Sequence, residues 1–165
     1  RLTINHNGLL SGTVSNPLTI DLTDCSVLFQ NWIYPLTGSL KPGQSISFDG
    51  VTPRNLEWHL TRRRVVDSQD VKTNWDPSGT DVPRLIEMMM FYGAAEGDAY
   101  TKLTHHYQSN IDLSDHLRGG RAILVGRGPN PASELARSRA SLKDDYDRHW
   151  AFYRLIFPVD QPERP

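Results

Sequence analysis

The stretch from residue 11 to residue 50 constrains the fold most, because it consists of short β-favouring runs separated by turn residues. Apolar and polar side chains alternate over residues 18–23, which predicts a strand with one buried face. The segment 25–34 is rich in aromatic and β-branched residues, which also favour strands. Pro42 and Gly43 then occupy the two central positions of a predicted β-turn. The region therefore predicts a mainly β protein.

Comparable patterns occur in the rest of the chain. Asn7-Gly8 is a strong signal for a hairpin between two strands at the N-terminus. Leu56, Trp58 and Leu60 alternate with polar residues, so we expect a half-buried strand over residues 56–61 with Trp58 on its buried face. Compact apolar runs predict two more strands, over residues 122–125 and 150–159.

The main helical signals fall in one part of the sequence. Asp81 is suited to cap a helix and Pro83 is suited to its first turn. A second helix is predicted over residues 98–107, and Ser114 is expected to cap a single turn. We therefore predict a mainly β, immunoglobulin-like β-sandwich with a two-helix insertion between strands at about residues 81–108. One domain would span residues 1–160, followed by a polar tail at 161–165.

The totals exclude several classes of protein. The chain has 165 residues and a formal net charge of −1, so it has no global field to attract nucleic acid. A single cysteine, Cys25, rules out a disulfide within the chain. No apolar run approaches the roughly 20 residues that span a bilayer, so any membrane attachment would come from segments outside this chain. Because the sequence begins at Arg1 without methionine, we expect a piece of a longer protein.

An ordered series of turn and strand motifs resembles a known kind of module. The motifs are Gly12-Thr13-Val14-Ser15-Asn16, Asp21-Leu22-Thr23-Asp24-Cys25 and Gly38-Ser39-Leu40-Lys41-Pro42-Gly43-Gln44, with Tyr153-Arg154-Leu155-Ile156-Phe157-Pro158-Val159 at the end. Together they resemble a module of large, uncharacterised bacterial membrane-anchored proteins, over about residues 10–50 and 121–160. The resemblance implies an extracytoplasmic β-sandwich, periplasmic or at the cell surface, with no catalytic residues to carry over. The predicted insertion departs from the simple module.

Candidate catalytic and metal-binding residues are scattered rather than patterned. His105 and His106 are adjacent, so on a helix they point in different directions, and only His116 and His149 could join one of them. The sequence contains no HExxH motif and no nucleophile elbow. Cys25 lies in a strand-forming segment, where a small buried apolar side chain is the expected role. We therefore predict no catalytic residue, no bound metal and no cofactor.

Two sets of residues are candidates for binding. The methionine and aromatic cluster of the insertion predicts a protein-partner surface at Met89, Met90, Tyr92 and Tyr100, because methionine adapts to irregular partner surfaces. Core packing against the sheet is the alternative role for the same cluster. A second hypothesis is a glycan- or peptide-binding site that uses a tryptophan as a stacking platform. Trp75, in a polar loop, is the candidate for that role.

The basic run Arg62-Arg63-Arg64 is the sharpest charge feature, and Asp67 and Asp70 follow it closely. A solvated strand end accounts for this run better than an anion-binding site does. The predicted function is thus a non-catalytic accessory or protein-interaction module of a larger cell-envelope protein, not a nucleic-acid-binding protein. The alternatives are the tryptophan-based ligand-binding domain and a histidine-based metal hydrolase.

Overall fold

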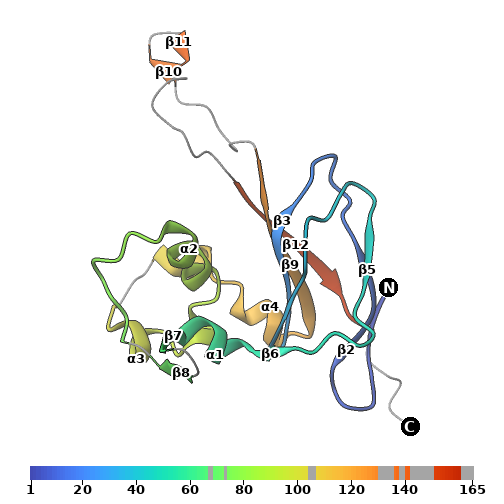
Figure 1. Ribbon diagram of the computed structural model, residues 1–165, viewed down its shortest axis with the longest axis horizontal. Helices are drawn as coiled ribbons and strands as arrows, with labels where there is room; N and C mark the ends of the chain where they lie inside the picture. The colour runs from blue at the N-terminus through green and yellow to red at the C-terminus, as the bar shows by residue number, and fades with distance from the viewer. Residues whose placement is uncertain are drawn as a thin grey trace. The chain divides into compact units, whose positions relative to one another are not determined.

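The computed structural model describes residues 1–66, 69–72, 74–103, 107–129, 136–137, 140–141 and 151–160. The described chain is mostly β structure with a few short helices (Figure 1). It divides into two compact units, each discontinuous in sequence. The first comprises Arg1–Val27, Pro35–Val51 and Ile123–Pro165, and the second comprises Leu28–Tyr34 and Thr52–Ala122.

The strands are short, and each described strand has two to eight residues. They are β1 (Leu2–Ile4), β2 (Leu10–Ser15), β3 (Thr23–Phe29), β4 (Trp32–Pro35), β5 (Ser45–Ser47), β6 (Arg54–Asn55), β7 (Arg62–Val66), β8 (Gln69–Lys72), β9 (Arg121–Gly128), β10 (Ala136–Arg137), β11 (Ala140–Ser141) and β12 (Ala151–Pro158). The α-helices are α1 (Leu56–Thr61), α2 (Val82–Met90), α3 (Asp98–Thr101) and α4 (Ser114–Arg118), and the 3₁₀ turns are η1 (Gly93–Ala95) and η2 (Tyr107–Asn110).

The first unit contains a three-stranded antiparallel sheet in the order β1-β2-β5. The β1–β2 hairpin turns at Asn7-Gly8, as the sequence predicts, and Gly8 has a φ of 75°. The Asn5 side chain holds this turn, because its Oδ1 accepts hydrogen bonds from the backbone N–H groups of Asn7 (2.9 Å) and Leu9 (3.0 Å). The turn before β5 is also confirmed: the Gln44 N–H donates to the Lys41 carbonyl at 3.0 Å.

A five-stranded sheet has the order β12-β9-β3-β4-β6. Strand β9 carries the longest buried run among the residues whose burial is described, Ala122 to Gly126, which confirms the apolar strand predicted there. Strand β12 forms one edge of this sheet and ends at Pro158, and proline is tolerated at the ends and on the edges of sheets. The coarse prediction of a mainly β fold is therefore confirmed.

Residues 18–23 do not form the predicted strand. Residues 18–20 bend, and Leu22 makes only an isolated bridge with Leu40. The cause is the buried Asn16, whose Nδ2 donates to the carbonyls of Ile20 (2.8 Å) and Leu40 (2.9 Å) and whose Oδ1 accepts from the Leu18 N–H (3.0 Å). The Asn16 side chain thus hydrogen-bonds to backbone groups that could otherwise pair with a neighbouring strand.

The prediction of a strand over residues 56–61 is wrong, because this segment forms helix α1. Leu56 and Leu60 lie one helical turn apart and are both buried, whereas Trp58 is 48% exposed. Asn55 starts the helix, because its Oδ1 accepts from the Trp58 N–H at 2.9 Å. A spacing of four residues between two buried leucines fits the period of a strand as well as that of a helix, and the cap favours the helix.

The helices predicted between β8 and β9 are confirmed in part. The Asp81 Oδ1 caps α2 by accepting from the Arg84 N–H at 3.3 Å. The second predicted helix is shorter than expected, because α3 ends at Lys102 in the left-handed conformation, with φ of 59°. Helix α4 confirms the predicted single turn, although Leu113 rather than Ser114 is its capping residue. In the second unit α1 and α4 both pack against η1.

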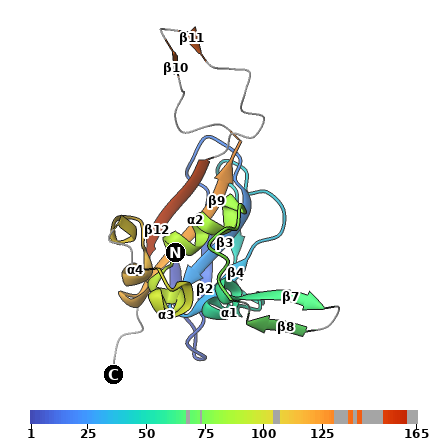
Figure 2. The same cartoon turned by 90° about the vertical axis from the view of Figure 1, so that its left-hand side faces the viewer.

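The basic run Arg62–Arg64 begins β7, which pairs with β8 as an antiparallel hairpin (Figure 2). None of the helices in the described residues is long and apolar enough to cross a membrane.

Candidate functional site

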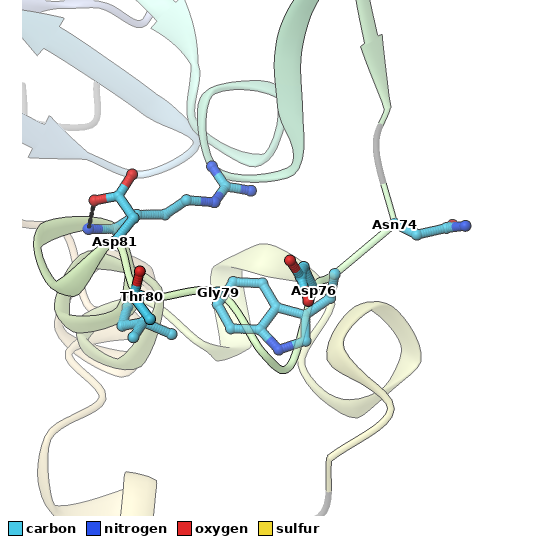
Figure 3. A pocket seen from close by; sticks show the side chains of 8 residues that line it. Asn74, Asp76, Gly79, Thr80 and Asp81 are labelled. Atoms are coloured by element: carbon cyan, nitrogen blue, oxygen red, sulfur yellow. Dashed lines mark hydrogen bonds between the residues drawn. The ribbon is translucent and has the colours of Figure 1, made fainter.

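A pocket of about 310 Å³ lies in the second unit, where the loop after β8 enters α2. Its lining comes from a single stretch of sequence: Asn74, Trp75, Asp76, Gly79, Thr80, Asp81, Arg84 and Leu85. We call this site the Trp75 pocket (Figure 3). Its volume falls at the small end of the range for ligand pockets, about 300 to 1,000 Å³.

Local hydrogen bonds determine the shape of the loop. The Asp76 Oδ1 accepts from the backbone N–H and the hydroxyl of Ser78, at 2.9 and 2.7 Å. The Gly79 N–H donates to the Asp76 carbonyl at 3.2 Å, which closes a turn over residues 76–79. Asp81 then caps α2. The two aspartates therefore order the backbone on both sides of Thr80.

The Trp75 indole is held by two side chains of the same unit. The guanidinium carbon of Arg84 lies 5.9 Å from the ring centroid, within reach of a cation–π interaction. Tyr100, from α3, meets the indole edge to face, with centroids 6.2 Å apart and planes at 65°. These contacts give the ring a defined orientation in the absence of a ligand.

A short chain of hydrogen bonds extends from the pocket into the unit. Arg84 Nη2 donates to the Tyr100 hydroxyl at 3.3 Å, and that hydroxyl donates to the Thr61 carbonyl at 3.3 Å. Thr61 is the last residue of α1 and is fully buried. The position of Arg84 thus depends on α1 and α3 as well as on α2.

The Trp75 indole N–H has an unusual environment. The nitrogen is buried, and it has no hydrogen-bond partner among the residues that the structure describes. A buried donor without a partner costs about 1–3 kcal/mol, so such groups are rare in cores and concentrate at sites with a role. Trp75 therefore stands out from ordinary packing residues.

The polar groups of the pocket are two carboxylates, a hydroxyl, an amide and a guanidinium. Figure 3 shows Thr80 and Asp81 beside each other, and the Asn74 side chain directed away from them. The formal charges of Asp76, Asp81 and Arg84 sum to −1. An aromatic face with a few placed polar groups is typical of a site that binds a small ligand or one unit of a larger ligand.

The predicted partner residues do not share one exposed surface. Met90 is 1% exposed and Tyr100 is 7% exposed, so the structure places both side chains in the interior. For these two residues the expectation of an exposed contact surface is corrected, because α2 directs Met88 and Met90 inward and Tyr100 supports Trp75. Met89 and Tyr92 are partly exposed, and their role as partner contacts stays a prediction.

The histidine hypothesis falls largely outside the described residues, since His105, His106 and His149 are not among them. Among the side chains that the structure does describe, no group of three or more His, Cys, Asp or Glu residues is arranged to hold a metal ion. Cys25 is buried, as expected for a small core residue, and desolvation together with the nearby Asp24 raises the pKa of its thiol to about 11.

Sequence reasoning singled out Trp75 but missed Arg84 as its partner and Tyr100 as its support. The cap at Asp81 is a local signal that places Arg84 in the first turn of α2, next to the loop. No local signal brings Tyr100 to Trp75, because that contact depends on how the chain returns after α2.

Fold and site together define a mainly β protein with a ligand-sized aromatic pocket. The family described as Domain of unknown function (DUF8725) matches residues 1–116, and the chain belongs to that family. The match includes every residue that lines the Trp75 pocket, and it ends before β9 and β12. No curated protein and no solved structure matches the chain.

Proposed function

We propose that this chain is a non-catalytic binding module whose ligand occupies the Trp75 pocket. The observation that carries the proposal is the fixed indole of Trp75, contacted by Arg84 and Tyr100 at the wall of a pocket of about 310 Å³. A ring that is already oriented loses little conformational entropy when a ligand packs on it. A non-catalytic role is supported by Asp76 and Asp81. Both carboxylates accept hydrogen bonds from neighbouring backbone N–H groups and thereby stabilise the loop and the start of α2.

The proposal includes the finer architecture and the cellular setting. We place the pocket on an immunoglobulin-like β-sandwich with a helical insertion, within a larger membrane-anchored protein of the bacterial envelope. The antiparallel three-stranded and five-stranded sheets support the architecture, and the motif resemblance over residues 10–50 and 121–160 supports the setting. Fusing a reporter enzyme that is active only outside the cytoplasm to the full-length protein tests the location. Reporter activity is expected, and an inactive fusion of normal abundance would contradict it.

The pocket is tested by a ligand-observed NMR screen of a library of small polar and aromatic fragments. Fragments that bind the wild-type chain are expected to lose binding in Trp75→Ala and to keep it in Trp58→Ala. Trp58 is the matched control, because it is 48% exposed and does not line the pocket. Fragments that bind the wild type and Trp75→Ala equally well, or a library without any binder, would reject the pocket as the ligand site.

A protein-interaction role is the second candidate, and the exposed apolar residues of the second unit favour it. Trp58, Val82 and Leu103 are 48%, 49% and 37% exposed, in addition to the partly exposed Met89 and Tyr92. Under this hypothesis, Trp58→Ser combined with Val82→Ser lowers binding to envelope fractions, while Trp75→Ala does not. Equal binding by all variants would remove this candidate.

A further inference from the structure

We propose that the Trp75 pocket takes a neutral, polyhydroxylated ring, which is the chemistry of one uncharged sugar unit in a glycan. The inference rests on the proposed function, because it names the class of ligand for the same site. It is carried by three properties of the pocket: its balance of charges, its supply of hydrogen-bond acceptors, and its oriented aromatic face.

The two carboxylates disfavour an anionic ligand, and Arg84 opposes a cationic ligand at the Trp75 ring. Asp76 and Asp81 line the pocket with two carboxylates, which repel an anionic ligand. Arg84 places its guanidinium 5.9 Å from the centre of the Trp75 ring, in the region that a cationic ligand would need for its own cation–π contact. A neutral ligand is repelled neither by the carboxylates nor by the guanidinium.

Hydroxyl groups suit the polar lining, because each hydroxyl both donates and accepts a hydrogen bond. A carboxylate can accept about four hydrogen bonds, so Asp76 and Asp81 can accept from ligand hydroxyls while they order the loop and cap α2. Hydrogen bonds to charged groups are the stronger kind, and acceptors of this kind select ligands that are rich in O–H donors. The Arg84 guanidinium and the Thr80 hydroxyl supply donors to the same space.

The indole supplies the apolar half of the site. A sugar ring has a face of C–H groups that can pack on an aromatic ring, while its hydroxyls point outward along the edge. Tyr100 contacts Trp75 at 65° and 6.2 Å between centroids, so the indole is braced from one side. The pocket of about 310 Å³ matches a ligand of one ring better than an extended chain.

The inference is tested with three probes that share a pyranose ring and differ in charge: methyl glucoside, glucuronate and glucosamine, supplemented by neutral mannosides, galactosides and N-acetylglucosaminides. The readout is the ¹H–¹⁵N signal of the Trp75 indole, assigned by its loss in Trp75→Phe. This donor has no partner among the described residues, so its signal is sensitive to a nearby ligand oxygen. Neutral sugars are expected to shift the signal saturably, and the charged analogues are expected to bind more weakly.

Asp76→Asn and Asp81→Asn are matched variants, because asparagine also forms the loop turn and the helix cap. Each is expected to weaken binding of the neutral sugar by about tenfold, the effect of one hydrogen bond to a charged group. Asp98→Asn removes a carboxylate that does not line the pocket, and it is expected to leave the affinity unchanged.

The outcomes separate the two proposals. Saturable shifts by neutral sugars that both pocket variants weaken support the inference. Shifts by amines, acids or peptides without any by neutral sugars overturn the inference and leave the Trp75 pocket as a binding site. A Trp75 signal that no probe and no fragment disturbs overturns both.

Discussion

The guanidinium carbon of Arg84 lies 5.9 Å from the centroid of the Trp75 indole, so an arginine from the first turn of α2 covers a tryptophan of the preceding loop. Arg84 also donates to the Tyr100 hydroxyl, which in turn donates to the Thr61 carbonyl. The pocket wall is thereby linked to α1 and α3 within the same unit. The contacts at the pocket wall therefore contribute to the folding stability of the helical region.

Arg84→Ala is expected to lower the free energy of unfolding by about 1–2 kcal/mol, the sum of a partly exposed cation–π contact and one hydrogen bond. Tyr100→Phe should remove the shared hydrogen bonds, and the double variant should lose less than the sum of the two single losses. Urea unfolding of all three measures the coupling. Arg54→Ala, in exposed β6, is the control and is expected to be neutral. Strict additivity would show that the chain of hydrogen bonds is not cooperative.

Asn16→Ala is expected to destabilise the first unit by about 2–4 kcal/mol, because it removes three hydrogen bonds of the buried amide, to the Ile20 and Leu40 carbonyls and from the Leu18 N–H. The Leu40 carbonyl keeps its bond from the Leu22 N–H. Thermal unfolding of the variant measures this loss. The exposed Asn31 offers a control, since Asn31→Ala changes the same residue type on the surface. Similar unfolding temperatures for the two variants would contradict the role of Asn16 in the bend at residues 18–20.

Gly12→Ala is expected to cost about 2 kcal/mol or more, because Gly12 has a φ of 101° and a Cβ there would overlap the carbonyl oxygen of Arg1. That carbonyl is held in place by the Thr13 N–H at 3.1 Å. Gly8→Ala is the matched control, since Gly8 also has a positive φ but open space around it, and about 1 kcal/mol is expected. Urea unfolding compares the two, and equal costs would exclude the steric overlap.

Cys25 is expected to resist aromatic disulfide reagents in the folded chain at pH 8, because burial, reinforced by Asp24, raises its pKa to about 11. The raised pKa favours the neutral thiol in the folded state. Its contribution to stability is therefore fully present below the ordinary thiol pKa of 9.0 and is lost as the pH rises through about 11.

The absorbance of the released reagent, with and without denaturant, measures this protection. Asp24→Asn should lower the pKa of Cys25 only partly, since burial is the larger cause. Rapid labelling of the folded wild type at pH 8 would contradict the buried position.

Local chemistry made several features predictable from the sequence. Asn7-Gly8 marks the β1–β2 hairpin, Asp81 caps α2, and residues 76–79 form a turn through the Asp76 side chain. Trp75 could be singled out because it stands in that polar loop. In each of these features the partners lie within a few residues of one another, so the sequence holds all the information that the interaction needs.

Features that depend on distant partners were not predictable in this way. Helix α1 was missed for a different reason: its Asn55 cap is local, but the alternation over residues 56–61 fits a strand as well as a helix. The burial of Met90 and Tyr100, which were predicted as partner contacts, does depend on distant residues, because it follows from which elements pack together.

The sequence alone determined the mainly β character, the turns, the helix cap and the loop that carries Trp75, because these follow from short-range sterics and hydrogen bonds. Only the tertiary structure determined the pocket wall. Tyr100 lies 16 residues from Arg84 and 39 from Thr61, and the bonds that join them form only when α1, α2 and α3 pack against one another. Contacts over such separations follow from chain topology, and no local pattern of residues encodes them.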